Sequence, residues 1–187
     1  MFEPMCLAED LDINIYITDT DSMHIEYDKV KTLKKKFSEK YGRELDGKQL
    51  GQFHIDFDLE DEDGNECENV YAEKSIFLGK KCYIDIIEGK NEKDETIVGH
   101  HIRMKGVPNS TLYYTADKLT NKQDVNDRLW EMYDYLYEGV ALDFDLLEGG
   151  TRPNFKFNGD MTIGYMKEFV RKLSFGSEKG SIHKVLA

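Results

Sequence analysis

Two short segments near the N-terminus alternate between apolar and polar positions. The apolar residues recur at every second position, first at Ile13, Ile15 and Ile17 and then at Met23, Ile25 and Tyr27. A period of two predicts half-buried β-strands. The polar run at residues 18–22 predicts the turn between them. The pattern therefore predicts a β-hairpin.

From Lys29 onward the spacing of the apolar residues lengthens. They fall three to four positions apart, at Val30, Leu33, Phe37 and Tyr41. This spacing predicts an amphipathic helix that packs on the hairpin with one face. Gly42 follows where the C-terminus of a helix favours glycine.

The middle of the chain predicts a loop, a strand region and a turn. Residues 58–69 are dense in acidic side chains and predict a loop or hairpin tip. Residues 75–87 predict a strand region, and residues 89–94 predict a further turn.

The C-terminal part has helical spacing. After Pro108 the pattern predicts helix, with Asp124 as an N-cap. The expected apolar helix face is Val125, Leu129, Met132, Tyr133 and Leu136. Gly149-Gly150 and Pro153 interrupt the chain before a last amphipathic stretch at residues 161–173. The whole pattern predicts an α+β fold, with an antiparallel sheet and packed helices followed by a mostly helical region.

Composition narrows the class of protein. The chain has 187 residues, of which 40% are hydrophobic, so it can bury a core. It lacks the roughly 20 apolar residues in a row that cross a bilayer and a signal-peptide pattern at its start, so we expect a soluble, cytoplasmic protein with no membrane partner. Cys6, Cys67 and Cys82 are widely scattered, which predicts reduced and unpaired thiols.

The charges are unevenly distributed along the chain. The net charge is −12, which is the wrong overall sign for a protein that binds nucleic acid. Residues 1–28 hold eight acids and no base, whereas residues 152–187 hold seven bases and three acids. Other lysines gather at residues 29–48 and around Lys80. Such a chain could attract metal at one place and phosphate at another.

Asp19 and Asp21 stand at the tip of the predicted hairpin. Two carboxylates this close repel each other unless a cation joins them. Carboxylate oxygens suit Mg²⁺, and paired metals support phosphoryl or nucleotidyl transfer. A bare D-x-D is common on protein surfaces, so the pair alone does not identify a metal site.

The residues around the aspartates resemble a known motif. Residues 15–22, I-Y-I-T-D-T-D-S, resemble the Y-x-D-T-D-S motif of family B DNA polymerases, with one additional residue if Tyr16 is the family tyrosine. Three further segments resemble family motifs in the family order. They are Leu50-Gly51-Gln52-Phe53, Lys80-Lys81-Cys82-Tyr83 and Lys105-Gly106-Val107, with Cys82 in place of an arginine.

The resemblance implies a DNA-directed DNA polymerase. Residues 1–105 would be a portion of the palm, with its antiparallel sheet, and residues 106–187 a thumb-like region. The spacing is closest to polymerases of phages, viruses and linear plasmids, including the protein-primed branch, which implies a host-cell cytoplasm. DNA replication would be the process, with primer-template DNA and dNTP as partners.

The resemblance also assigns roles at the hairpin. Asp21 would bind the catalytic Mg²⁺ or Mn²⁺ directly, and Asp19 would lie in an outer or auxiliary position. Near this active site, Thr20 and Ser22 are expected to shape the turn by local hydrogen bonds. Tyr16 would either pack in the core or contact the primer end.

A second group of residues is expected to hold DNA. Lys81 and Tyr83 are two apart on a predicted strand and would therefore share a face, from which they could grip the sugar-phosphate backbone without reading bases. In the family this motif steadies the primer terminus. Lys80 would assist, and Lys74 is a weaker candidate for phosphate contact.

Two family patterns do not occur in these residues. They are the D-x-x-S-L-Y-P strand, which supplies a further metal-binding aspartate, and the N-S-x-Y-G helix, which binds the nucleotide. We therefore expect a C-terminal part of a polymerase, as a split subunit, fragment or remnant, that is inactive alone. Its partners would include the missing N-terminal portion and, for protein priming, a terminal protein.

Two other functions remain open on the sequence. One is a D-x-D glycosyltransferase that uses a divalent ion, although only eighteen residues precede Asp19. The other is a non-enzymatic acidic interaction module. A dehalogenase-type phosphatase is disfavoured because Met23 stands where that motif needs threonine or valine.

Overall fold

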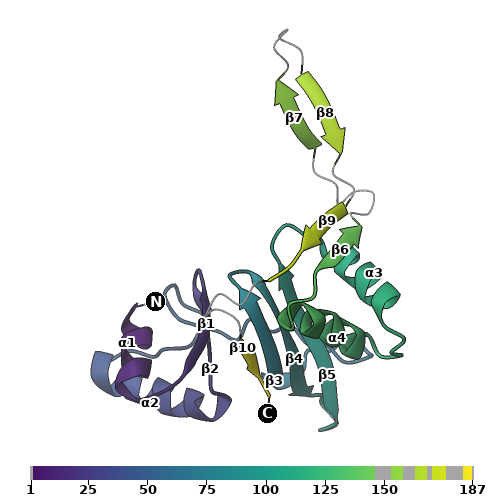
Figure 1. Cartoon of the computed structure of the whole chain (residues 1–187). Helices are drawn as coiled ribbons and strands as arrows, with labels where there is room; N and C mark the ends of the chain where they lie inside the picture. The colour runs from purple at the N-terminus through teal and green to yellow at the C-terminus, as the bar shows by residue number, and fades with distance from the viewer. Residues whose placement is uncertain (1, 146–152, 158–162, 168–169, 176–182, 187) are drawn as a thin grey trace. The chain divides into compact units, whose positions relative to one another are not determined.

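A computed structural model describes residues 2–145, 153–157, 163–167, 170–175 and 183–186. It combines helices with antiparallel sheets (Figure 1), which confirms the α+β class. The elements in chain order are α1 (Phe2–Asp10), β1 (Ile15–Asp19), β2 (Ser22–Ile25), the 3-10 turn η1 (Tyr27–Lys29), α2 (Val30–Tyr41), β3 (Glu68–Gly79), β4 (Cys82–Lys90), β5 (Thr96–Met104), α3 (Asn109–Leu119), α4 (Val125–Tyr137), β6 (Leu142–Asp145), β7 (Pro153–Phe157), β8 (Ile163–Lys167), β9 (Val170–Leu173) and β10 (His183–Val185).

The contacts between residues divide the chain into two compact units. The first unit holds residues 1–72 and 87–98, and the second holds residues 73–86 and 99–187. The chain passes from one unit to the other within β3, β4 and β5. The sequence-based division at residue 105 follows the order of the motifs and stays a prediction.

The first unit contains the predicted hairpin and two helices. Strands β1 and β2 pair antiparallel, and their apolar residues pack with α1 and α2. The buried core of this group is Leu7, Ala8, Ile13, Leu33, Phe37 and Leu45. Helix α2 lies where the spacing predicted it. Gly42 ends it with a φ of 67° and donates its N–H to the Ser38 carbonyl at 2.9 Å, a left-handed conformation that glycine adopts without strain.

Helix α1 was not predicted from the sequence. It is only nine residues long, and its buried residues are Pro4, Leu7 and Ala8. So few apolar positions do not form a recognisable period. Its place in the structure depends on packing against α2.

The acidic segment of the first unit forms a tight turn, as predicted. Glu60 and Glu66 form an antiparallel bridge across it. The carboxylate of Asp61 accepts backbone N–H groups from Asp63 at 3.0 Å and Asn65 at 2.9 Å. These hydrogen bonds fix the turn through its own side chain.

The second unit contains β10 and the parts of β3, β4 and β5 at residues 73–79, 82–86 and 99–104, which belong to a four-stranded sheet in the order β10-β3-β4-β5. Helices α3 and α4 pack on one face of this sheet (Figure 1), and together they bury the largest core of the described chain. Its members are Ile76, Leu78, Ile84, Ile86, Ile102, Met104, Val107, Leu112, Ala116, Leu129, Met132, Tyr133, Leu136, Leu142 and Phe144. Asp124 caps α4 as predicted, because its carboxylate accepts the N–H groups of Asn126 and Asp127 at 2.8 and 3.2 Å.

The helical character of the C-terminal region ends at Tyr137, which corrects the expectation of a mostly helical region. The chain continues as strands: β6 pairs antiparallel with β9, and β7 pairs antiparallel with β8. In β6 the pattern has a period of two, since Leu142 and Phe144 are buried and Asp143 is exposed. Of the predicted stretch at residues 161–173, the described parts are strands β8 and β9. Gly149-Gly150 lies outside the described residues.

None of the described helices is long and apolar enough to cross a membrane.

Candidate metal-binding hairpin and basic turn

The two aspartates lie at the apex of a tight hairpin. Strand β1 ends at Asp19 and β2 begins at Ser22, so only Thr20 and Asp21 form the turn. Thr20 has a φ of 58°, a conformation that a β-branched residue adopts only under strain. The turn therefore places both aspartates at the end of a two-stranded hairpin, as the pattern predicted.

Thr20 and Ser22 both make local hydrogen bonds within this turn. The Ser22 hydroxyl donates to the Asp19 carbonyl oxygen at 3.1 Å, and the Thr20 hydroxyl lies 3.3 Å from Asp19 Oδ1. Asp19 is half-buried, whereas Asp21 is exposed. Of the two carboxylates, that of Asp21 is the more accessible to an ion from solvent.

Strand β1 contains an irregularity at Tyr16. Ile15 pairs with Ile25 and Ile17 pairs with His24, so the register shifts between the two isoleucines. A β-bulge accommodates one extra residue in a strand in this way. Partial burial, followed by the nearby Glu26 and Asp28, raises the pKa of Tyr16 above its ordinary value. Its hydroxyl is therefore protonated at neutral pH.

The described residues supply only part of a metal site. Asp19 and Asp21 offer hard carboxylate oxygens that fit Mg²⁺ or Mn²⁺. The described residues bring no group of three or more His, Cys, Asp or Glu side chains together to hold a metal ion. Two carboxylates at the end of a hairpin can thus contribute ligands to a metal whose other ligands come from substrate phosphates, water or another polypeptide.

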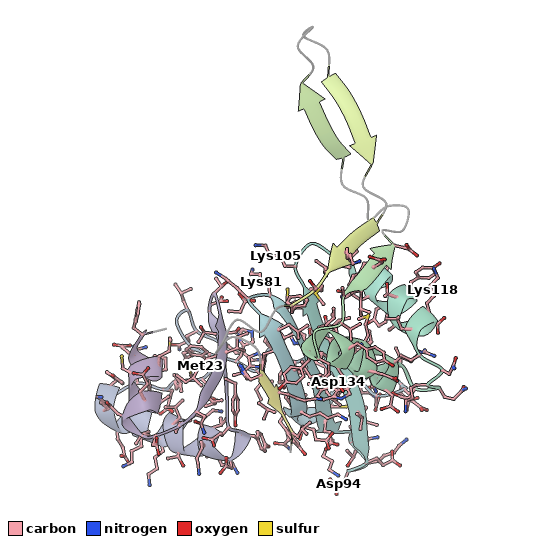
Figure 2. All side chains as sticks on the ribbon, in the orientation of Figure 1. Met23, Lys81, Asp94, Lys105, Lys118 and Asp134 are labelled. Carbon is pink, nitrogen blue, oxygen red and sulfur yellow. The ribbon has the colours of Figure 1, made fainter. Side chains whose placement is uncertain are left out.

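Lys80 and Lys81 form a turn, which corrects the prediction that they lie on a strand. Strand β3 ends at Gly79 and β4 begins at Cys82, so the two lysines are the whole connection. Lys81 has a φ of 59°, and its carbonyl accepts the backbone N–H of Lys105 at 2.8 Å. Figure 2 shows Lys81 and Lys105 at the same end of the sheet.

The position of Tyr83 also differs from the prediction. Since Lys81 belongs to the turn, the two side chains do not share a strand face. The Tyr83 side chain is only 4% exposed, and its ring centroid lies 5.7 Å from that of His101. Burial makes Tyr83 part of the interior, while Lys80 and Lys81 are both exposed. The DNA contact expected of this segment therefore rests on the two lysines and stays a prediction.

Lys74 has a contact within the second unit. Its ammonium lies 4.6 Å from the centroid of the Trp130 ring, within the range of a cation–π interaction. Lys74 therefore packs on the helix α4 side of the sheet. Its expected contact with phosphate stays a prediction.

A buried polar group in the second unit was missed by the sequence reasoning. Asp85 is 0% exposed. Its carboxylate accepts the hydroxyl of Ser75 at 2.6 Å and lies 3.1 Å from Nδ1 of His101. A lone aspartate in the apolar run of residues 83–87 was the signal, because a charge in a buried strand requires partners. The neighbouring His100 points to the opposite face, where its ring nitrogens contact Asn126 and Tyr113.

The predicted site residues fall into two groups. Tyr16, Asp19, Thr20, Asp21 and Ser22 belong to the first unit, and Lys74, Lys80, Lys81 and Tyr83 belong to the second. The structure thus brings the aspartates together within one unit and the lysines within the other.

Comparisons of the chain with protein-family models, with curated proteins and with solved structures gave no match.

Proposed function

We propose that this chain supplies metal-binding aspartates and primer-template contacts to a DNA-directed DNA polymerase of the family B type. The observation that carries the proposal is the Asp-Thr-Asp apex, at which a two-residue turn holds two carboxylates at the end of β1 and β2. The three downstream motifs, in family order, support the same proposal.

The additional residue in the first motif fits this proposal. It separates the present sequence from the Y-x-D-T-D-S pattern, and the register shift in β1 lies beside Tyr16. A bulge at that point absorbs one residue before the turn. The aspartates can then keep their place at the apex despite the longer segment.

Asp21 and Asp19 of the hairpin have different roles in metal binding. Asp21 is exposed and serves as the direct ligand, while Asp19, half-buried and close to the Thr20 hydroxyl, serves in an outer position. Paired metals, when bound, would activate an attacking hydroxyl and neutralise the leaving pyrophosphate. The metal pair needs a further carboxylate in addition to the two at the apex.

The basic turn, which consists of Lys80 and Lys81, binds the phosphate backbone of the nucleic acid. Lys80 and Lys81 are exposed, and neither forms an ion pair with any described carboxylate. Exposed ammonium groups bind phosphates without reading bases, which a replicating enzyme requires. The hydrogen bond from Lys105 to Lys81 fixes the turn that presents them.

A primer-extension assay tests the proposal. It compares this chain, a polypeptide that carries the D-x-x-S-L-Y-P strand and the N-S-x-Y-G helix, and the mixture of the two, each with Mg²⁺ and dNTPs. We expect templated synthesis only from the mixture, since it completes both the set of carboxylates and the nucleotide pocket. Robust synthesis by this chain alone would show that its own residues form a complete centre. A folded but inactive mixture would favour a polymerase remnant or the acidic interaction module.

A further inference from the structure

The last described strand lies at the edge of the second unit's sheet. Strand β10 has three residues, and it pairs antiparallel with β3 through His183–Phe77, Lys184–Ile76 and Val185–Ser75. Alternate side chains of a strand point to opposite faces. The ring of His183 accordingly lies 4.8 Å from that of Phe77, centroid to centroid, while Lys184 reaches helix α4 on the other face.

Lys184 is held by three side chains of α4. Its ammonium pairs with the Asp134 carboxylate and lies 5.2 Å from the Tyr137 ring centroid and 5.9 Å from that of Trp130. Residues 130, 134 and 137 share one helix face because they are spaced four and three apart. The Lys184 side chain is only 20% exposed, so most of its surface is removed from water. The three residues Trp130, Asp134 and Tyr137 form what we call the α4 box.

A carboxylate and aromatic rings together favour a cation over a neutral or anionic group. The carboxylate supplies charge, and the ring faces attract a cation by their quadrupoles. Lys74 of β3 also places its ammonium 4.6 Å from the Trp130 centroid. Trp130 thus has lysine ammonium groups near it from two neighbouring strands, which supports the preference of this surface for a cation.

We propose that the edge of β3 at residues 75–77, together with Trp130, Asp134 and Tyr137, is a strand-docking site for a short β-strand with a central lysine. Its occupant is the chain's own C-terminal strand β10. Pairing over three residues gives few backbone hydrogen bonds, and such short edge segments open at low free energy. Once β10 is released, a free peptide of the same sequence should therefore bind this edge. This site is separate from the metal-binding hairpin and does not depend on polymerase activity.

Backbone and side-chain contacts would make different contributions to the recognition of a peptide at this site. Main-chain hydrogen bonds to a sheet edge give affinity, and pockets for alternate side chains give specificity. The central lysine enters the α4 box, and the ring of the residue before it packs against Phe77. The ligand class is therefore a peptide that carries an aromatic or imidazole ring followed by lysine and a β-branched residue.

Trp130 is the only tryptophan of the chain, so its fluorescence reports directly on the box. In the full chain, Lys184→Glu places a carboxylate against Asp134 and should release β10. We expect Trp130 emission to move to longer wavelength. Among residues 75–77, amide hydrogen exchange should rise about tenfold at the N–H groups that face β10. The uncharged Lys184→Met variant should show the same changes to a smaller degree, without charge repulsion.

Peptide addition then tests the site in trans. The peptide Ser-Ile-His-Lys-Val-Leu-Ala, which copies residues 181–187, should bind the Lys184→Glu chain saturably and restore both signals. The same peptide with glutamate in place of lysine should restore neither. The matched control is Lys118→Glu, because Lys118 pairs with Asp145 at 3.0 Å and lies 4.4 Å from the Tyr114 ring centroid, away from Trp130. Figure 2 labels Lys118 and Asp134.

Two results would overturn the proposal. One is unchanged Trp130 emission and exchange in both Lys184 variants while far-UV circular dichroism shows the native fold. The other is equal binding of the two peptides, which would show that the lysine box does not recognise the strand. If Lys184→Glu fails to fold, the Lys184→Met chain serves for the same peptide comparison.

Discussion

At the hairpin apex, two residues of the same type lie in different surroundings. Asp19 is half-buried with the Thr20 hydroxyl 3.3 Å from its carboxylate, while Asp21 is exposed in the turn itself. The neutral Thr20 hydroxyl lies near the Asp19 carboxylate, so the Asp21 carboxylate is better placed to receive an ion. Burial and local hydrogen bonding therefore distinguish the two, although the sequence motif treats them as a pair.

This difference predicts unequal effects of substitution on metal binding. In the complex with the complementing polypeptide, Asp21→Ala should weaken Mn²⁺ binding and abolish extension, because a direct ligand is lost. Asp19→Ala should weaken both less. Mn²⁺ titration of each variant, followed by primer extension, measures the effects. If Asp19→Ala abolished extension while Asp21→Ala left it intact, the two roles would be reversed.

The reactivity of Cys82, compared with that of Cys6, tests whether the Cys82 thiol is buried. Burial raises the pKa of the Cys82 thiol above its ordinary value, and the opposing influence of Lys105 is smaller. Since the thiolate is the reactive form, Cys82 should be alkylated by iodoacetamide more slowly than the exposed Cys6 at neutral pH. Its rate should keep rising as the pH is raised into the alkaline range. Peptide mapping by mass spectrometry at several times and pH values measures both rates, and equal labelling of Cys6 and Cys82 would contradict this environment.

Among the elements, α4 has the best-defined start. The Asp124 carboxylate accepts two backbone N–H groups of the first turn, and α4 contributes Leu129, Met132, Tyr133 and Leu136 to the main core. Asp124→Ala should lower the free energy of unfolding by about 1 kcal/mol, the usual effect of losing an N-cap. Asp124→Asn should retain most of it, because asparagine caps nearly as well. Urea denaturation measures both variants, and an unchanged midpoint for Asp124→Ala would show that the cap adds nothing here.

The elements with a clear period could be predicted from the sequence. The hairpin, α2 and α4 each have several apolar positions at regular spacing. Helix α1 has too few apolar positions, and strands β6 to β10 are only three to five residues long, too short for an alternation of two to stand out in the sequence. The turn at Lys80 and Lys81 was missed because neither lysine is a typical turn residue. Its signal was the preceding Gly79, which adopts a φ of 149°.

The candidate site was predictable to the extent that it is local in sequence. Asp19, Thr20, Asp21 and Ser22 are consecutive, so a hairpin prediction places them together. Ser75, Asp85 and His101 come from three different strands, and only the pairing of β3, β4 and β5 brings them into contact. No single segment of sequence contains that information.

At the scale of the whole molecule, the net charge of −12 opposes any approach to DNA. Binding should therefore be weak and strongly dependent on salt. In the complemented complex, Lys81→Ala should reduce affinity to a similar degree for several DNA sequences and lower the slope of log K against log salt concentration by about one. Lys118→Ala, which removes a lysine already paired with Asp145, should change neither. Fluorescence anisotropy measures the binding, and a loss confined to one DNA sequence would indicate base readout instead.

The passage of the chain between units within β3, β4 and β5 has a consequence for how such a gene can change. The first unit consists of residues 1–72 and 87–98, and the second takes up the intervening residues 73–86 and continues from residue 99. No single recombination breakpoint can therefore separate one complete unit from the other. Neither half can be exchanged as a cassette, and we expect the two units to have diverged together as one inherited block.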